Sequence, residues 1–437
     1  MNNKRLALFP ALLLAGTLLT TGIQTQAQNI LTKELTQEVA SQKGSLIRIV
    51  SSSRKVTIKS WDQPKVKVTM EVVYDTSYPR KNKTDVEWFE DLGIHIKPFS
   101  NRVDILTGPS THLVSGKLYT TVYPKEVIVD GQQINPYKKL PLKVKTVPGS
   151  QQGNKLEEVV VSGYRRPTIR IMSIMVPAGC KLDIENNYGD VVIGMNVDEA
   201  KLEISNGTLD AQDIKDLKLV ANYCNANLGN IDKAEVEFKN GSFRAQNIND
   251  LDMDSRSSSI EYEKGNYLYV RSDADHYTID AIDKVDGRKT YGSIKIDQLN
   301  TSFDLEGNNV DIKIRNIGQD VSLIKINNKY GDLRLPVKNL KNYFVDFIGE
   351  YSTVFAPFQK EVVKEEEKKE TEGTATGTSN DKVKEVVVVG YGTNRQKATT
   401  TSAGEVAPRH FTSTMGDTKG KHTRIELTCH YCTLDFK

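Results

Sequence analysis

The sequence predicts an all-β protein: a single-domain β-solenoid, of the β-helix or β-roll kind, with coils of about 17–20 residues and two irregular insertions. A 17-residue repeat runs through the middle of the chain, with coils that begin at Lys218, Glu235, Asp252, Tyr269 and Asp286. Each coil, meaning one circuit of the chain, repeats a pair of apolar residues separated by one outward residue, as a half-buried strand requires. So short a unit cannot bury its own apolar face, so neighbouring coils must stack into one core.

Equivalent positions of successive coils carry the same kind of residue. The ninth and eleventh positions are apolar in Ala226/Leu228, Phe243/Ala245, Ile260/Tyr262, Tyr277/Ile279 and Ile294/Ile296. The fourteenth holds Ile231, Ile248, Ile282 and Leu299, with Gly265 as the one gap. The turn between the two strands holds small or polar residues at Cys224, Gly241, Ser258, Asp275 and Gly292. This regularity predicts parallel strands in register from coil to coil.

The chain begins with the pattern of a secretory signal peptide over residues 1–27. Lys4 and Arg5 precede an apolar stretch from Leu6 to Leu19, and Thr25-Gln26-Ala27 fits a cleavage site. The apolar stretch of about 14 residues is shorter than the ~20 that a membrane span needs, so a retained anchor is the less favoured alternative. We therefore expect an exported protein, at the cell surface, associated with the outer membrane, or periplasmic.

The remaining segments follow from changes in pattern. After an N-terminal lead at 28–43, residues 44–108 alternate short strands with turns, and the part from Asp85 to Phe99 is expected to continue as strands. Prolines and a Gly/Gln/Ser run mark 109–167 as an insertion. The main repeats occupy 168–358, and 359–421 has the composition of a flexible charged linker. Because Tyr431-Cys432 matches Tyr223-Cys224, residues 422–437 are expected to form the last coil.

Charge and composition exclude several classes of function. Removal of Lys4 and Arg5 from the 59 basic residues leaves 57, against 56 acidic ones. This near-neutral balance offers no basic field for nucleic acid. No long apolar run after the signal predicts an integral membrane protein. No Gly-x-Ser-x-Gly or Walker-type loop occurs, and we expect neither an enzyme nor a bound cofactor or metal.

Three groups of residues invite a chemical interpretation. Cys429 and Cys432 have the spacing of a redox or zinc site. Residues three apart on a strand face opposite sides, which favours a structural thiol pair or a disulfide instead. The redox state of these two cysteines, of Cys180 and of Cys224 stays open. The pairs Asp252/Asp254 and Asp273/Asp275 are expected to be solvated outward residues rather than calcium ligands or an acid–base pair.

Tyrosines recur just before the turns, among them Tyr188, Tyr223, Tyr291, Tyr330 and Tyr351. They are expected to cap turns and cover the edge of the core, because tyrosine suits a half-wet position. The alternative is a ligand-binding aromatic row.

Residues 44–108 and 168–358 resemble a bacterial exported "putative adhesin" domain family of unknown function. The resemblance lies in Leu46 to Val72, in Ile169 to Gly179 and in the Asn187-Tyr188-Gly189-Asp190-Val191 coil. It implies a β-solenoid and a non-catalytic binding role at a Gram-negative cell envelope, with a protein or a glycan as partner. The family supplies no catalytic residues to carry over.

A second resemblance is local. The segment Glu385-Val386-Val387-Val388-Val389-Gly390-Tyr391 is similar to the TonB box of Bacteroidota outer-membrane transporters. A degenerate copy runs from Glu158 through Val159, Val160, Val161 and Gly163 to Tyr164. The resemblance implies addition of an extended strand to the edge of a TonB-like protein. The alternatives are a strand that folds onto the solenoid or a partner, and a cassette shared between genes without its function. No membrane barrel follows, which excludes transport by this chain.

Overall fold

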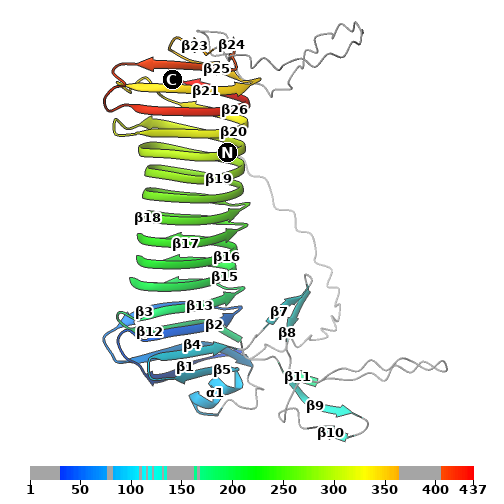
Figure 1. The fold of residues 1–437 in the computed structure, drawn as a ribbon. Helices are drawn as coiled ribbons and strands as arrows, with labels where there is room; N and C mark the ends of the chain where they lie inside the picture. The colour runs from blue at the N-terminus through cyan, green and yellow to red at the C-terminus, as the bar shows by residue number, and fades with distance from the viewer. Residues whose placement is uncertain are drawn as a thin grey trace, which may run out of the picture.

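A computed structural model describes residues 30–75, 82–107, 111–114, 117–120, 123–129, 132–134, 162–164, 168–363 and 405–437, with the backbone alone for most of 111–170. Within these ranges the chain is almost entirely β-strand, with one helix, which confirms the all-β prediction. One sheet of 21 strands holds the main body together. Its strands form a tall stack of coils (Figure 1).

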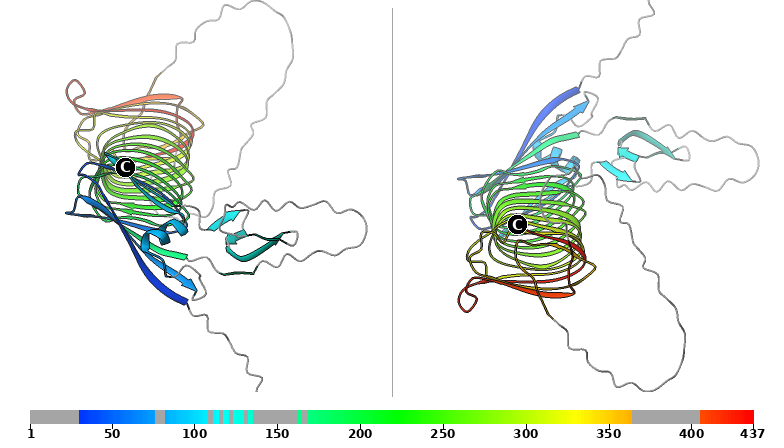
Figure 2. Two further views of the ribbon diagram at one scale, coloured as in Figure 1. Left: turned by 90° about the horizontal axis from the view of Figure 1, so that it is seen from below. Right: turned by 90° about the horizontal axis from the view of Figure 1, so that it is seen from above.

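The middle of the stack is a run of parallel strands paired in register. Leu219 pairs with Val236, Val236 with Met253, and Met253 with Val270, an offset of one 17-residue repeat each time. Seen along the stack, the coils overlie one another (Figure 2). The strands are β15 (Val197–Ala211), β16 (Ile214–Leu228), β17 (Ile231–Lys239), β18 (Ser242–Arg256), β19 (Ser259–Ile317) and β20 (Leu323–Leu335).

The interior of the stack is apolar, as the alternation predicts. The apolar pair of each coil and the residue at its fourteenth position are buried and belong to one continuous cluster. The gap at Gly265 is filled by its neighbours, since a Cβ there would lie 2.8 Å from Ile282 Cδ1 and 3.1 Å from Tyr262 Cε2. The coils therefore share one core, and each contributes a layer to it.

Each coil turns a corner at a residue with a left-handed backbone. Tyr223 has φ 51°, and the residue after it, Cys224, is buried, as is Ala221 two residues before. A left-handed residue breaks the alternation of a strand, so two outward residues stand together and the chain then turns inward again. The same conformation occurs at Ser53, Tyr188, Asn206, Asn240, Ser257, Ala274, Tyr291, Asn309, Tyr330, Tyr351 and Tyr431.

Outward polar side chains also link neighbouring coils. Asn247 Nδ2 donates to Asn230 Oδ1 over 2.6 Å, and Asn230 Nδ2 donates to Asp213 Oδ1 over 3.0 Å, so three successive coils form a ladder. Asn300 and Asp283 form a similar bond of 2.9 Å. Such ladders require the coils to keep one register, which reinforces the register set by the core.

The N-terminal end of the stack is closed by antiparallel strands. β13 pairs in parallel with both β2 and β15, and so joins the early strands to the main stack. β12 pairs in parallel with β3 and antiparallel with β4, while β1 pairs antiparallel with β4 and β5 with β6. The bounds are β1 (Ile30–Ala40), β2 (Leu46–Ser52), β3 (Lys55–Trp61), β4 (Lys65–Asp75), β5 (Ile94–Pro98), β6 (Arg102–Thr107), β12 (Thr168–Pro177), β13 (Lys181–Asn187) and β14 (Val191–Ile193).

The prediction of strands from Asp85 onward is wrong for its first part. Residues Asp85–Asp91 form the helix α1, which buries Trp88 and Phe89. The Thr84 side chain accepts from the backbone N–H of Glu87, and the Glu87 side chain accepts from that of Thr84, which completes a capping box. Two adjacent buried aromatic residues fit one face of a helix better than one face of a strand.

The segment predicted as an insertion forms two small sheets of its own. β7 (Thr111–Val114) pairs antiparallel with β8 (Lys117–Thr120). β9 pairs antiparallel with β10 and with β11, and none of these five strands joins the main sheet. Their bounds are β9 (Tyr123–Val129), β10 (Gln132–Ile134) and β11 (Ser162–Tyr164).

The C-terminal strand does not form the last coil, which corrects the prediction. β26 (Thr423–Phe436) pairs in parallel with β20 on one side and with β21 (Tyr343–Glu350) on the other, so it lies between two coils that precede it in the sequence. β25 (His410–Met415) then pairs antiparallel with β21. The short strands β22 (Thr353–Phe355), β23 (Glu361–Val362) and β24 (Glu405–Val406) complete this end of the stack.

Candidate binding surface

The side chains of the corner tyrosines are partly exposed, which fits the predicted half-wet position. Tyr330 is 41% exposed, Tyr431 50% and Tyr351 71%. A bulky side chain rarely adopts a left-handed backbone, and such outliers persist where the surrounding structure holds them. Here the paired strands on both sides of each corner fix the chain. The alternative interpretation, a ligand-binding aromatic row, stays a prediction.

Three of these tyrosines form a stack. Tyr431 lies between Tyr330 and Tyr351, with ring centroids 5.2 Å and 5.1 Å away and interplanar angles of 15° and 9°. Both faces of the Tyr431 ring are therefore covered, and the stack offers its edge and three phenol groups to solvent. Each phenol both donates and accepts hydrogen bonds, so this tyrosine stack is suited to a polar ligand.

A shallow hollow of about 490 Å³ begins next to the corner, one residue after Tyr291 and two after Tyr330. Its charged side chains come from successive coils, and Lys313 pairs with Arg334 in the strand register. Arg334 Nε lies 3.3 Å from Asp435 Oδ2, and the Asp311 carboxylate accepts from the Asp332 backbone N–H over 3.0 Å. The charged hollow is lined by His276, Ser293, Lys295, Asp311, Lys313, Asp332 and Arg334, among others.

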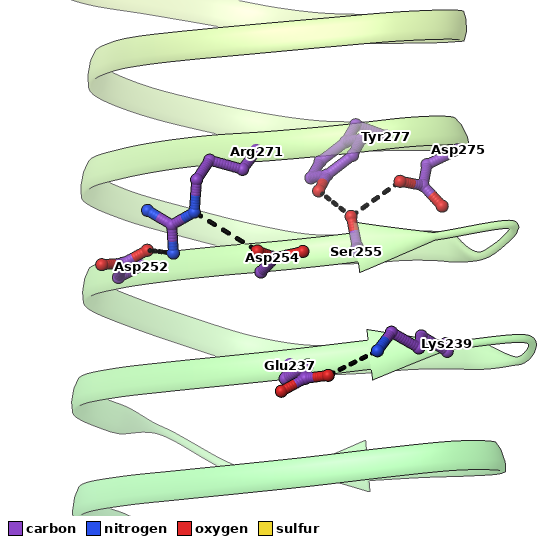
Figure 3. Close-up of polar contacts among 8 residues, drawn as sticks. All are labelled: Glu237, Lys239, Asp252, Asp254, Ser255, Arg271, Asp275 and Tyr277. Carbon is purple, nitrogen blue, oxygen red and sulfur yellow. Dashed lines mark hydrogen bonds and ion pairs between the residues drawn. The ribbon is translucent and has the colours of Figure 1, made fainter.

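Asp275 is fully buried, which corrects the expectation that it is a solvated outward residue. The left-handed Ala274 before it turns the chain, so Asp275 points inward. Its carboxylate accepts from Ser255 Oγ over 2.7 Å, from Ser272 Oγ over 2.5 Å and from the Ser258 N–H over 2.6 Å. Figure 3 shows Ser255 between this carboxylate and the Tyr277 hydroxyl. The buried Asp275 side chain thus accepts three hydrogen bonds from neutral donors, and such bonds offset the cost of burying a polar group.

The other acidic side chains do lie at the surface, where they form ion pairs. Arg271 bridges Asp252 and Asp254 over 2.8 Å and 3.4 Å (Figure 3), and Arg256 pairs with Asp273 over 3.2 Å. Within the described ranges, no three His, Cys, Asp or Glu side chains come together in a way that would hold a metal ion. The acidic pairs are therefore part of the ionic surface of the stack.

A lysine is buried in the same cluster. Lys289 is 1% exposed, and its Nζ donates to Ser272 Oγ over 2.9 Å and to the Asp275 carbonyl over 2.7 Å. Its Nζ also lies 5.2 Å from the centroid of the Tyr277 ring. Burial lowers the pKa of Lys289 to about 8, although the nearby Asp275 opposes the shift. Burial also raises the pKa of Tyr277.

The lowered pKa of Lys289 predicts a change of stability with pH. An unfolded lysine has a pKa of about 10.4, so between pH 8 and 10 the unfolded state binds more protons than the folded state. The free energy of unfolding should therefore rise over this window, by roughly 2 kcal/mol from this group. Urea denaturation at pH 8, 9 and 10 should show this slope in the wild type and lose it in Lys289→Met. An equal slope in both proteins would contradict the assignment.

All four cysteines are buried, and none forms a disulfide. Cys429 and Cys432 both point inward, so the prediction that they face opposite sides is wrong, because the left-handed Tyr431 between them shifts the alternation. A hydrogen bond with Cys432 and burial together raise the pKa of the Cys429 thiol, and burial raises the pKa of Cys224 to about 12. The Cys429 thiol therefore has little nucleophilic character.

Most of the TonB-box-like residues lie outside the part of the chain that the structure describes. Glu385, Val386, Val387, Val388, Val389, Gly390 and Tyr391 lie outside the described residues, as do Glu158, Val159, Val160 and Val161. Gly163 and Tyr164 belong to β11, which pairs with β9 rather than with the stack. Strand addition to a TonB-like partner stays a prediction.

Comparisons with known proteins identify no family. No protein-family model matches the chain, and no curated protein matches it. Among solved structures, it aligns with a putative cell adhesion protein from Clostridium sporogenes ATCC 15579, at 9% identity over 93% of this chain and 99% of that one. The TM-score of 0.16 is too low to support an argument about fold or function. No helix among the described residues has the length and apolar character needed to cross a membrane.

Proposed function

We propose that this chain is a non-catalytic β-solenoid, exported to the cell envelope, that acts as an adhesin-type scaffold and binds a protein or a glycan there. The parallel, in-register pairing of β15 to β20 supports the solenoid, because a chain that pairs with itself one repeat later must wind around an interior. Outward polar side chains form ladders across successive coils, as Asp213, Asn230 and Asn247 do. A polymer lying along the stack can therefore meet polar groups on several coils in turn.

The observation that carries the proposal is the tyrosine stack on its left-handed corners. Edge-on phenols in solvent contribute less to the core than buried rings do, and the left-handed backbone costs about 1–3 kcal/mol per residue. Tyr330, Tyr431 and Tyr351 nevertheless stand together, close to a hollow that holds both cations and carboxylates. Aromatic rims combined with mixed polar groups are typical of surfaces that bind other molecules.

The burial of the reactive groups supports a binding role over a catalytic one. Asp275 and Lys289 lie in the interior, and the thiols of Cys429 and Cys432 are buried as well. The outward acids Asp252, Asp254 and Asp273 are engaged by arginines.

The test compares binding to isolated envelopes of the source cells. The triple variant Tyr330→Phe/Tyr351→Phe/Tyr431→Phe keeps the stacked rings and removes three hydroxyl groups. We expect its binding to fall about tenfold, the equivalent of one to two hydrogen bonds. Tyr188→Phe/Tyr223→Phe is the matched control, because these tyrosines occupy the same corner outside the stack. The proposal fails if the wild type does not bind envelopes, or if the triple variant binds as the control does.

A further inference from the structure

A second hollow, of about 400 Å³, lies on a different part of the surface, over the coils that contain β15, β16 and β18. Its polar side chains are amides, apart from one carboxylate, and no cation lines it. This amide notch is lined by Asn196, Gln212, Asp213, Asn227, Gly229 and Gln246, with Ala211 and Leu228 as its apolar part.

The notch exists because one coil has a glycine where its neighbours have glutamine. Ala211 pairs with Leu228 and Leu228 with Ala245, so the residues that follow them, Gln212, Gly229 and Gln246, occupy one position in three successive coils. The backbone confirms the order: the Gly229 N–H donates to the Ala211 carbonyl over 3.0 Å, and the Gln246 N–H donates to the Gly229 carbonyl over 3.3 Å.

The neighbouring coil lies too close to Gly229 to leave room for a side chain there. A Cβ on Gly229 would lie 2.6 Å from Asp213 Oδ1 and 3.0 Å from the Gln212 carbonyl carbon. Gln212 and Gln246 thus stand two strand spacings apart, roughly 9.6 Å, with no side chain between them. The space between the two glutamines is the space that a side chain at position 229 would occupy.

The groups around the notch suit a neutral, hydroxyl-rich ligand. The side-chain amides of Asn196, Gln212 and Gln246 make no hydrogen bond to other described residues, whereas Asn227 Nδ2 donates to Asp210 Oδ1 over 2.9 Å. Each free amide offers both donors and an acceptor, which is what a hydroxyl group needs. The carboxylate of Asp213 accepts from the backbone N–H of Asn230 over 2.8 Å and from its Nδ2 over 3.0 Å.

The charge of the notch decides between classes of ligand. An anionic ligand would meet the Asp213 carboxylate with no cation in the lining to offset the repulsion, and this one carboxylate is the only charged group that the lining offers to a cation. A neutral sugar avoids this repulsion. Its hydroxyl groups can form hydrogen bonds with the outward amides of Gln212 and Gln246.

We propose that the amide notch binds a neutral sugar unit of a polysaccharide, with Gln212 and Gln246 as the two hydrogen-bonding walls. This rests on the binding role proposed above but uses a surface separate from the tyrosine stack, so the two proposals can fail independently. The arrangement is particular to these coils, because the next residues of the row are Gly194 on one side and Glu263 on the other.

Affinity electrophoresis of the full chain through gels that contain dextran, a β-glucan or mannan tests the proposal. We expect at least one neutral polysaccharide to slow the wild type, and Gln212→Ala/Gln246→Ala to weaken this retardation about tenfold. A second variant, Gln212→Glu/Gln246→Glu, keeps the size of both walls and should weaken it as much. Asn266→Ala is the matched control, since it removes an exposed amide outside the notch and should change nothing.

Three results would overturn the proposal. The first is no retardation by any neutral polysaccharide, and the second is equal retardation of the wild type and both double variants. The third is retardation by alginate, an acidic polysaccharide, that only the notch variants lose, which would assign a different ligand class. The tyrosine triple variant separates the two proposals, because it should keep the retardation even where it loses binding to envelopes.

Discussion

Deletion of residues 423–437 is expected to unfold the C-terminal end of the stack, with a loss of several degrees or more in Tm. β26 is the shared partner of β20 and β21, so its removal leaves two rows of backbone groups without partners. It also removes apolar side chains from the interior of two neighbouring coils. These are Ile425, Leu427, Cys429, Cys432, Leu434 and Phe436.

The effect should be confined to this end of the molecule, because each coil of a stack contacts only its neighbours. Limited proteolysis of the truncated chain should therefore cut first between 336 and 363 and spare the coils before 320. A synthetic peptide of residues 423–437, added in excess, should restore protection, whereas the same peptide with Ile425→Asp and Leu427→Asp should not. A truncated chain with an unchanged Tm and unchanged proteolysis would contradict the central place of β26.

Ile282→Asp is expected to lower the free energy of unfolding by about 4 kcal/mol, among the largest effects of any single substitution in this chain. Ile282 is fully buried, and its Cδ1 fills the space that Gly265 leaves open. An aspartate there would lose this packing and place a carboxylate in the apolar interior, near the ring of Tyr262. Ile248→Asp, two coils earlier in the same row, should behave alike.

The matched control is Asn266→Asp, which adds the same charge at an exposed position one residue after Gly265. Urea denaturation followed by circular dichroism should separate the two, with the control within about 0.5 kcal/mol of the wild type. If Ile282→Asp matched the control, the register of the repeat would be wrong.

The register of the stack was predictable because the alternation of apolar residues determines which face of a strand is buried. A pairing offset of 17 follows from the middle coils, such as those of Val236 and Met253, whereas Ser302 pairs with Leu323 at an offset of 21. The corners were harder to predict, because no side-chain type is obligatory at a left-handed residue. Asp275 and the Cys429/Cys432 pair face inward because of this conformation, so their burial was not predicted. The helix at Asp85–Asp91 did carry a signal, the Thr84-x-x-Glu87 capping box.

The place of β26 could not be predicted from the repeat. Tyr431-Cys432 matches the corner Tyr223-Cys224, so the match shows that the segment can form a coil but not between which neighbours. The candidate binding surface was predictable in part. The tyrosine row follows from the spacing, but the stacking of Tyr330 with Tyr431 joins residues that only the inserted strand brings together. The notch at Gly229 could not be predicted, because it depends on which residues of the neighbouring coils lie next to this glycine.

Because β26 lies between β20 and β21, the strands at this end of the stack cannot assemble in the order in which they are synthesised. The Thr423 hydroxyl donates to the Val321 carbonyl across 102 residues of sequence, whereas most contacts in the stack join residues one coil apart. Closing so long a loop costs more conformational entropy than adding the next coil, so this contact forms late. Coils before β20 can assemble as the chain emerges, but β21 cannot find both neighbours until residues 423–436 have been made. Completion of this end of the stack therefore depends on a strand that is synthesised well after the coils it joins.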